Sequence, residues 1–158
     1  MCVCRTRSTY KGLMILIFGT MKEAYVSFEV ARLLKEKGFD WTCITYYVDY
    51  EPNDVKYSML FEDNTTWEER CCSAPTHQMA CAWLREKYLI HVYAEHKAFF
   101  QEKPRKLYYH WIPFVKTLPH CPINKSGFTK DTISLDVYCN TYEDAVEAAL
   151  KYSLENLI

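Results

Sequence analysis

Apolar residues recur every three or four positions in three stretches of the chain and alternate with polar residues in several others. In the first helical stretch, Val30 and Leu34 lie one turn apart on a predicted buried face. Ser27 precedes them as a favourable N-cap, and Gly38 follows where a left-handed residue commonly ends a helix. The pattern therefore predicts an amphipathic helix over residues 27–37.

Two further helices are predicted in the second half of the chain. One covers 75–87, because Pro75 suits the first helical turn and apolar residues then recur at helical spacing. The last begins at Asn140 or Thr141, where acidic residues in the first turn favour the positive end of the helix dipole. Its predicted buried face consists of Val146, Ala149, Leu150, Leu154 and Leu157.

Strands are predicted between these helices, from stretches rich in β-branched and aromatic residues. They lie at 41–48, 89–95, 107–115 and 132–139. The polar segment 49–74 is too long for a structureless loop, so we expect a hairpin or an ordered excursion with a short strand at 57–61. These elements predict an α+β fold with a mainly antiparallel sheet and helices packed on one face. The C-terminal half has the order helix, three strands, helix (α-β-β-β-α).

The first twenty residues differ from the rest, since they contain no acidic residue and no clear helical or strand period. The apolar run 13–18 follows basic residues, but no small-residue cleavage site follows it. It is also far shorter than the roughly 20 residues that span a bilayer. Two interpretations stay open. Residues 1–20 are an N-terminal extension to a single α+β domain over 21–158, or 13–18 is a genuine first strand.

Length and charge narrow the classes of function. A chain of 158 residues fits one domain, and its net charge of −1 provides no strong overall field for nucleic acid or for an anionic membrane. The chain contains eight cysteines. Because no recognisable export signal accompanies them, we expect reduced thiols and a cytoplasmic protein.

Candidate catalytic and metal-binding residues are few. The spacing of Cys72, His77 and Cys81 could bring ligands to one metal ion, but the paired cysteine knuckles of structural zinc sites are missing. The chain has no G-x-S-x-G nucleophile elbow, and four glycines leave no phosphate-binding loop. We therefore expect no enzyme activity, no cofactor and no bound metal.

The order of elements in 75–158 resembles the double-stranded-RNA-binding domain, in topology alone. In that family the second helix begins with a basic cluster that grips phosphates, whereas residues 141–147 here read Thr-Tyr-Glu-Asp-Ala-Val-Glu. The resemblance therefore implies the fold and argues against the activity. An alternative nucleic-acid site lies in the predicted loop from Lys97 to Lys106. Its candidate contacts are Lys103, Arg105 and Lys106.

A second resemblance rests on three segments of the chain. These are YVSFEVARLLKEKGF at 25–39, SAPTHQMACAWLRE at 73–86 and TYEDAVEAAL at 141–150. They look like segments of small uncharacterised proteins of gut-bacterial phages and mobile elements, and the resemblance covers most of 21–158. It implies a small accessory protein and assigns no catalytic or binding residue. Residues 1–20 fall outside it, which favours Met21 as the ancestral start.

Aromatic residues are the strongest departure from ordinary composition, at 16% with 13 tyrosines. If Tyr109 and Trp111 share one face of their strand, Tyr108 and His110 share the other, and one pair packs under the helices. An exposed aromatic sheet face is typical of a protein interface. We therefore expect a non-enzymatic module that forms a homodimer or binds a protein partner, without a membrane. The expected interface residues are Tyr93, Tyr108 and Tyr138. A nucleic-acid-binding domain and a small-ligand or nucleotide-binding protein are the alternatives.

Overall fold

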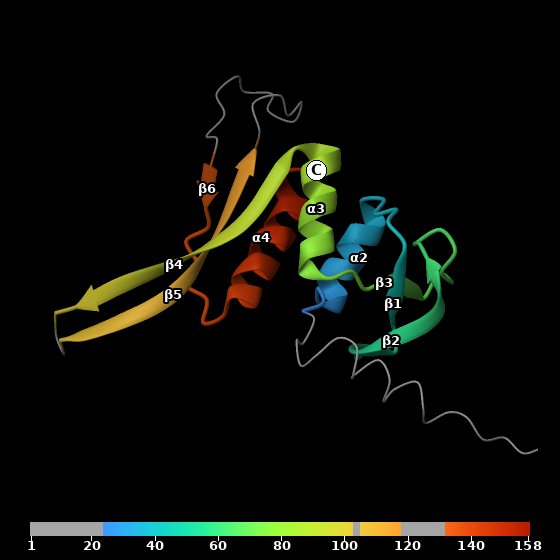
Figure 1. The fold of residues 1–158 in the computed structure, drawn as a ribbon, viewed down its shortest axis with the longest axis horizontal. Coiled ribbons are helices and arrows are strands. Elements are labelled where there is room, and N and C mark those ends of the chain that lie inside the picture. The colour runs from blue at the N-terminus through green and yellow to red at the C-terminus, as the bar shows by residue number, and fades with distance from the viewer. Residues whose placement is uncertain (1–23, 103–104, 118–131) are drawn as a thin grey trace, which may run out of the picture.

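The computed structural model of the protein describes residues 24–102, 105–117 and 132–158 (Figure 1). Its elements in chain order are α2 (Phe28–Glu36), β1 (Cys43–Val48), β2 (Glu51–Glu62), β3 (Cys71–Ser73), α3 (His77–Tyr88), β4 (Ile90–Gln101), β5 (Lys106–Thr117), β6 (Thr132–Ser134) and α4 (Tyr142–Asn156). The described strands form two antiparallel three-stranded sheets, in the orders β2-β1-β3 and β4-β5-β6. The α+β class and the C-terminal order of helix, three strands and helix are confirmed, although the strands divide between two sheets.

Local sequence signals explain where α2 and α4 begin. Ser27 Oγ accepts a hydrogen bond from the backbone N–H of Val30 at 3.3 Å, and Thr141 Oγ1 accepts one from Asp144 at 3.1 Å. Each hydroxyl satisfies a backbone donor that lacks a partner within its helix. Gly38 has a φ of 77°, so the predicted left-handed residue after the first helix is also confirmed.

The start of α3 differs from the prediction. Thr76 is the N-cap, and its hydroxyl accepts a hydrogen bond from Met79 N at 3.3 Å. Pro75 therefore lies before the helix and not in its first turn. The physical reason is a tertiary contact, because the carbonyl oxygen of Pro75 accepts a hydrogen bond from Val26 N at 3.1 Å and holds this segment extended.

Residues 49–74 contain more sheet than the sequence predicts. β1 and β2 form an antiparallel hairpin that closes at the pair Val48 and Glu51, so the expected hairpin is confirmed. The second strand of this hairpin spans twelve residues, whereas the sequence predicts a short one at 57–61. β3 pairs with the other edge of β1 and was not predicted. Its three residues carry too little periodicity to be recognised locally.

The β4–β5 hairpin is longer than predicted. Ile90 pairs with Thr117 at its base and Gln101 pairs with Lys106 near its tip. The segment from Lys97 to Gln101 is therefore strand, and the prediction of a loop there is wrong. The alternation of apolar and polar residues that marks a strand is absent from this segment, because both of its faces carry aromatic residues.

β6 is shorter than predicted, since it ends at Ser134 and not near Cys139. The N–H of Val137 donates to the carbonyl oxygen of Leu135 at 2.7 Å, so the chain turns away from the ladder. It returns at an isolated bridge between Cys139 and Trp111. The strand-like alternation of 132–139 is therefore interrupted in its middle.

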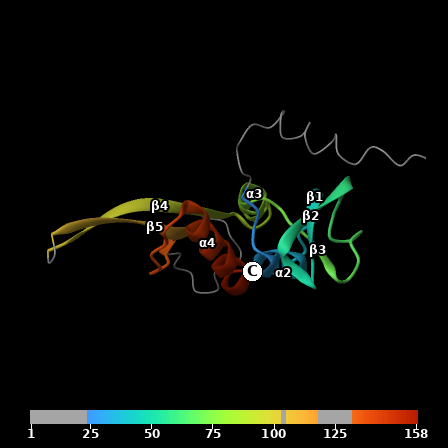
Figure 2. The ribbon, with the colours of Figure 1, turned by 90° about the horizontal axis from the view of Figure 1, so that it is seen from below.

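The helices lie between the two sheets, and α4 covers one side of the β4–β5 ribbon (Figures 1 and 2). One hydrophobic cluster includes buried residues from all three described helices and from both described sheets. Its fully buried members include Leu34, Trp83, Leu84, Ile90, Val115, Val146, Ala149, Leu150 and Leu154. The predicted buried face of α4 is thus confirmed except at Leu157, which is partly exposed. Residues 1–20, including the proposed strand at 13–18, lie outside the described residues.

Candidate functional site

The outer half of the β4–β5 hairpin projects beyond the helices (Figure 1). Its strands pair over twelve residues each, a length of about 40 Å at 3.4 Å per residue. Helix α4 has 15 residues and is about 22 Å long at 1.5 Å per residue. The helix therefore covers only part of the ribbon. We use the term arm for residues 96–101 and 106–111, which lie near the point where the cover by α4 ends and extend beyond it to the hairpin tip.

Because side chains alternate across a strand, the pairing register assigns each arm residue to one of two faces. The helix-side face continues the buried side of the sheet, where Val92 and Val115 form a pair in the core. In the arm this face consists of His96, Ala98, Phe100, Leu107, Tyr109 and Trp111. The opposite, open face consists in the arm of Lys97, Phe99, Gln101, Lys106, Tyr108 and His110. It continues toward the base through Tyr93 and Phe114.

The helix-side face changes from buried to exposed at Trp111. This ring meets the ring of Tyr142, in the first turn of α4, edge to face at a centroid distance of 5.2 Å. Farther out, Phe100 is 63%, Leu107 46% and Tyr109 55% exposed. None of the arm residues on this face is Asp, Glu, Lys or Arg. The arm thus presents an apolar, uncharged surface that no described helix covers.

The three tyrosines predicted as interface residues all lie on the open face. Tyr93 is half-buried and stacks on Phe114 at 5.3 Å. Tyr138 is 61% exposed and meets the ring of Phe99 edge to face at 5.0 Å. Tyr108 is half-buried on the same face. The structure therefore brings these residues to one surface, on the side of the sheet away from α4.

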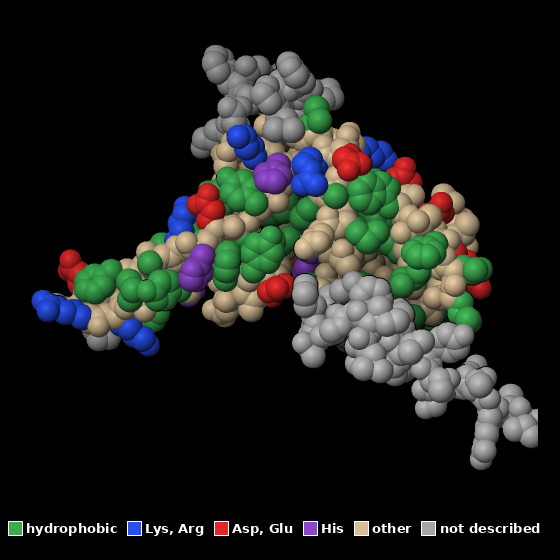
Figure 3. All heavy atoms as spheres, viewed as in Figure 1, with side chains coloured by type: hydrophobic (Ala, Val, Ile, Leu, Met, Phe, Trp, Pro, Cys, Tyr) green, Lys and Arg blue, Asp and Glu red, His purple; other side chains and the backbone are tan. Residues whose placement is uncertain are grey.

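Cations are interleaved with the rings of the open face. Lys97 Nζ lies 4.7 Å from the ring centroid of Phe114, and Lys106 Nζ lies 5.0 Å from that of Tyr108. Of the three predicted nucleic-acid contacts, Lys106 and the exposed Arg105 lie at the hairpin tip, and Lys103 lies outside the described residues. Figure 3 shows blue and purple side chains alternating with green ones along this face.

A second exposed apolar surface lies on β2. Between the pairs Cys43–Glu62 and Thr45–Tyr57, the register shifts, so this strand carries extra residues that face no partner. Met59, which belongs to this bulge, is 100% exposed, and Leu60 and Phe61 after it are 66% and 74% exposed. The apolar residues of this surface are Tyr57, Met59, Leu60 and Phe61. Nothing in the local sequence predicted this bulge, because it depends on pairing with β1.

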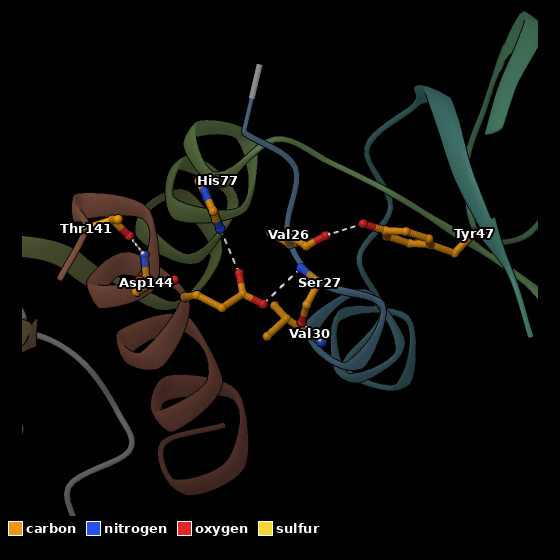
Figure 4. Close-up of polar contacts among 8 residues, drawn as sticks. Val26, Ser27, Val30, Tyr47, His77, Thr141 and Asp144 are labelled. Carbon is orange, nitrogen blue, oxygen red and sulfur yellow. Dashed lines mark hydrogen bonds and ion pairs between the residues drawn. The ribbon is translucent and has the colours of Figure 1, made fainter. Parts of the chain in front are cut away.

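A polar junction joins the three helices (Figure 4). The Glu147 carboxylate on α4 lies 2.7 Å from His77 Nε2 and accepts a hydrogen bond from Ser27 N at 2.9 Å. Burial opposes ionisation of this carboxyl, but the hydrogen bonds from His77 and Ser27 outweigh it and lower the pKa of Glu147. The side chains of His77 and Glu147 therefore both serve to hold the helices together.

The cysteines near this junction are poorly suited to nucleophilic or metal chemistry. Burial raises the pKa of Cys81 to about 12 and that of Cys72 to about 11, so both thiols stay protonated near neutral pH. His77, the third residue of the candidate metal set, is engaged with Glu147. In the described parts of the chain, no three His, Cys, Asp or Glu side chains are grouped closely enough to hold a metal ion.

A groove of about 480 Å³ lies between β6 and α4. Asp136, Lys151 and Glu155 line it together with apolar residues. It is wide and mixed in charge, unlike the apolar, enclosed pockets that bind most small ligands. The small-ligand alternative stays a prediction.

Comparison with known protein families, with curated proteins and with solved structures finds no match to this chain. The described helices include none that is long and apolar enough to cross a membrane. The candidate site therefore rests on the geometry of the arm. Sequence reasoning missed Phe100 and Leu107, although two aromatic residues in succession at 99–100 indicate that both faces of a strand carry apolar groups.

Proposed function

We propose that this protein is a non-enzymatic, cytoplasmic module that self-associates, with the helix-side face of the arm docking on a second copy of the chain. The observation that supports this proposal is the exposure of Phe100, Leu107 and Tyr109 on a surface without charges. The five described cysteines are free thiols, in keeping with a reducing compartment.

The arm has a physical reason to bind a partner. A two-stranded hairpin without a third strand or a covering helix is only marginally stable in water. Beyond Trp111, no described strand pairs with β4 and β5 as a third strand, although Tyr138 packs on Phe99 and His110 of the open face. Docking of its apolar face would remove Phe100 and Tyr109 from water and would stabilise the hairpin at the same time.

A second copy fits this face better than a charged partner does. A two-fold interface places each surface against itself, so a surface that carries like charges repels its own copy. The helix-side face of the arm carries no charged side chain, whereas the open face carries Lys97 and Lys106. The chain's net charge of −1 adds little repulsion between copies.

The size of the surface indicates a weak dimer. Phe100, Leu107, Tyr109 and Tyr142 are each close to half exposed or more, and together they present on the order of 400 Å² per protomer. A standard stable interface buries about 800 Å² on each partner. We therefore expect a dissociation constant between about 1 μM and 1 mM, with an association that depends on protein concentration.

Sedimentation velocity over a range of micromolar concentrations tests the proposal. Tyr109→Ser should shift the protein to monomer, because it removes an exposed ring from the helix-side face. Tyr108→Ser is the matched control, since it also removes a tyrosine ring, but from the neighbouring residue, which lies on the open face. Leu60→Ser controls for the apolar surface of β2.

Three results would contradict the arm interface. These are a strict monomer at high micromolar concentration, a dimer that resists Tyr109→Ser, and a dimer lost with Tyr108→Ser or Leu60→Ser instead. Loss with Tyr108→Ser would favour the interface of Tyr93, Tyr108 and Tyr138 that the sequence predicts.

A further inference from the structure

We infer that the open face of the β4-β5-β6 sheet binds single-stranded nucleic acid, as a stacking platform flanked by cations. This inference goes beyond the proposed self-association, because it concerns the other face of the sheet. It also differs from the loop site expected from the sequence, because the strands themselves supply the contacts.

Two groups of rings form the platform. Near the base, the partly exposed rings of His91 and Tyr93 stack at a centroid distance of 5.4 Å, and Phe114, which is only 7% exposed, packs against Tyr93 at 5.3 Å and supports it. In the arm, Tyr138 contacts both Phe99 at 5.0 Å and His110 at 5.7 Å. Nucleic-acid bases stack on aromatic side chains whatever their sequence, because each base has a π face.

Cations lie between and beside these groups. By the pairing register, Lys97, Lys106 and Lys116 share the open face, and Glu95 is the acid that shares it in β4 and β5. Glu95 Oε2 lies 3.4 Å from Lys97 Nζ, and both side chains are nearly half exposed. Residues 90–102 and 105–117 carry four cations and two acids, although the whole chain has a net charge of −1. The long hairpin is thus a locally basic part of a near-neutral protein.

The position of the acids favours a single strand over a duplex. Glu143 and Asp144 occupy the first turn of α4, on the other side of the sheet from the open face. A duplex that docked on the start of this helix would meet negative charge. A duplex on the open face would keep its base faces stacked inside, out of reach of the rings. Unpaired bases can use both the rings and the lysines.

The number of lysines on the open face predicts how strongly the binding affinity should depend on salt. If Lys97, Lys106 and Lys116 each neutralise one phosphate, the logarithm of affinity falls with the logarithm of salt at a slope of about −2 for a single strand. Raising the salt from about 50 to about 200 mM should then weaken binding roughly 20-fold. Oligo(U) and oligo(dT) present the same stacking and phosphate chemistry, so both are suitable probes.

The test is fluorescence anisotropy with labelled oligo(U), oligo(dT) and a duplex, each of about 16 nucleotides. Protein is used well below the concentration at which it self-associates, so loss of the dimer and loss of binding are separate results. We expect both single strands to bind and the duplex to bind at least tenfold more weakly. Lys97→Gln and Lys106→Gln should each lower the salt slope by about 0.7.

Substitutions on the two faces provide the matched pair. Tyr108→Ala should weaken binding of the single strands about tenfold. Tyr109→Ala, one residue away on the helix-side face, should leave it unchanged. The inference is overturned if no single strand binds at low salt, if the duplex binds as tightly, or if the lysine variants bind with the unaltered slope. Equal loss with Tyr109→Ala would overturn it as well. The lysine variants change exposed groups, so they remain informative even if the tyrosine variants lose the fold.

Discussion

His77 Nε2 lies 2.7 Å from one oxygen of Glu147, and the other oxygen of this carboxylate accepts the backbone N–H of Ser27 at 2.9 Å. One side chain of α4 therefore ties down both the first residue of α3 and the N-cap of α2. The carboxylate accepts hydrogen bonds from two other helices and so links α2, α3 and α4. A histidine beside a glutamate is a residue pair common in active sites, but here the pair has a structural role.

Glu147→Gln should destabilise the protein by about 1–3 kcal/mol near neutral pH, because it weakens two hydrogen bonds made by a partly buried carboxylate. The native fold lowers the pKa of Glu147, so the ionised carboxylate contributes stability above the pKa of an unfolded glutamate, about 4.3. That contribution is lost as pH falls through the lower folded pKa. The difference between the parent protein and Glu147→Gln should therefore shrink under acidic conditions, as measured by urea denaturation at several pH values.

Glu155→Gln is the control for this experiment, because Glu155 is exposed on the same helix. It should change the free energy of unfolding by less than about 0.5 kcal/mol. An equal loss in both variants at neutral pH, or a constant difference at every pH, would argue that Glu147 does not act through its charge.

Leu150→Ala should lower the free energy of unfolding by about 2–5 kcal/mol. Leu150 is fully buried between α4 and the rest of the core, so truncation leaves a cavity. Leu150→Asp should unfold the protein, because it places an unpaired charge in that position. Lys151→Ala provides the comparison on the next residue, and it should change stability far less because it removes only an exposed ion pair with Glu29. A cooperatively folded Leu150→Asp protein would show that α4 is not docked as described.

The sequence predicted best what short-range interactions decide. The caps at Ser27 and Thr141 and the left-handed Gly38 depend on residues three or four positions away. Ser27 and Gly38 were predicted outright, and Thr141 was one of the two predicted starts of the last helix. The start of α3 was misplaced because a distant residue, Val26, bonds Pro75. Long-range pairing likewise decided how the strands divide between two sheets.

The candidate surface was harder to predict for a geometric reason. Alternation correctly separates Tyr108 from Tyr109, but it does not show where α4 begins relative to the ribbon. The contact between Trp111 and Tyr142 fixes that position. Tyr109, two residues farther out, shares the buried side of the sheet with Val115 and is nonetheless exposed. In a hairpin that extends beyond its covering helix, the face on which a residue lies therefore does not decide whether the residue is buried.

Zinc should be absent from the purified protein. His77 is engaged with Glu147, and burial raises the pKa of Cys72 and Cys81, so a metal would have to displace a hydrogen bond and deprotonate buried thiols. Metal analysis should give well under one equivalent, and a chelator should leave the melting curve unchanged. Stoichiometric zinc that disappears with Cys81→Ser would contradict this prediction.

Shortening the arm tests whether it serves the fold or an interaction. Replacing residues 97–110 with Asn-Gly joins the paired residues His96 and Trp111 through a two-residue turn that suits a hairpin. The core pairs nearer the base stay in place, and none of the removed side chains belongs to the buried cluster. The melting temperature should therefore change by only a few degrees, whereas self-association should be lost and binding of single strands should become much weaker. A shortened protein that unfolds would show that the arm stabilises the domain, and one that still dimerises would place the interface elsewhere.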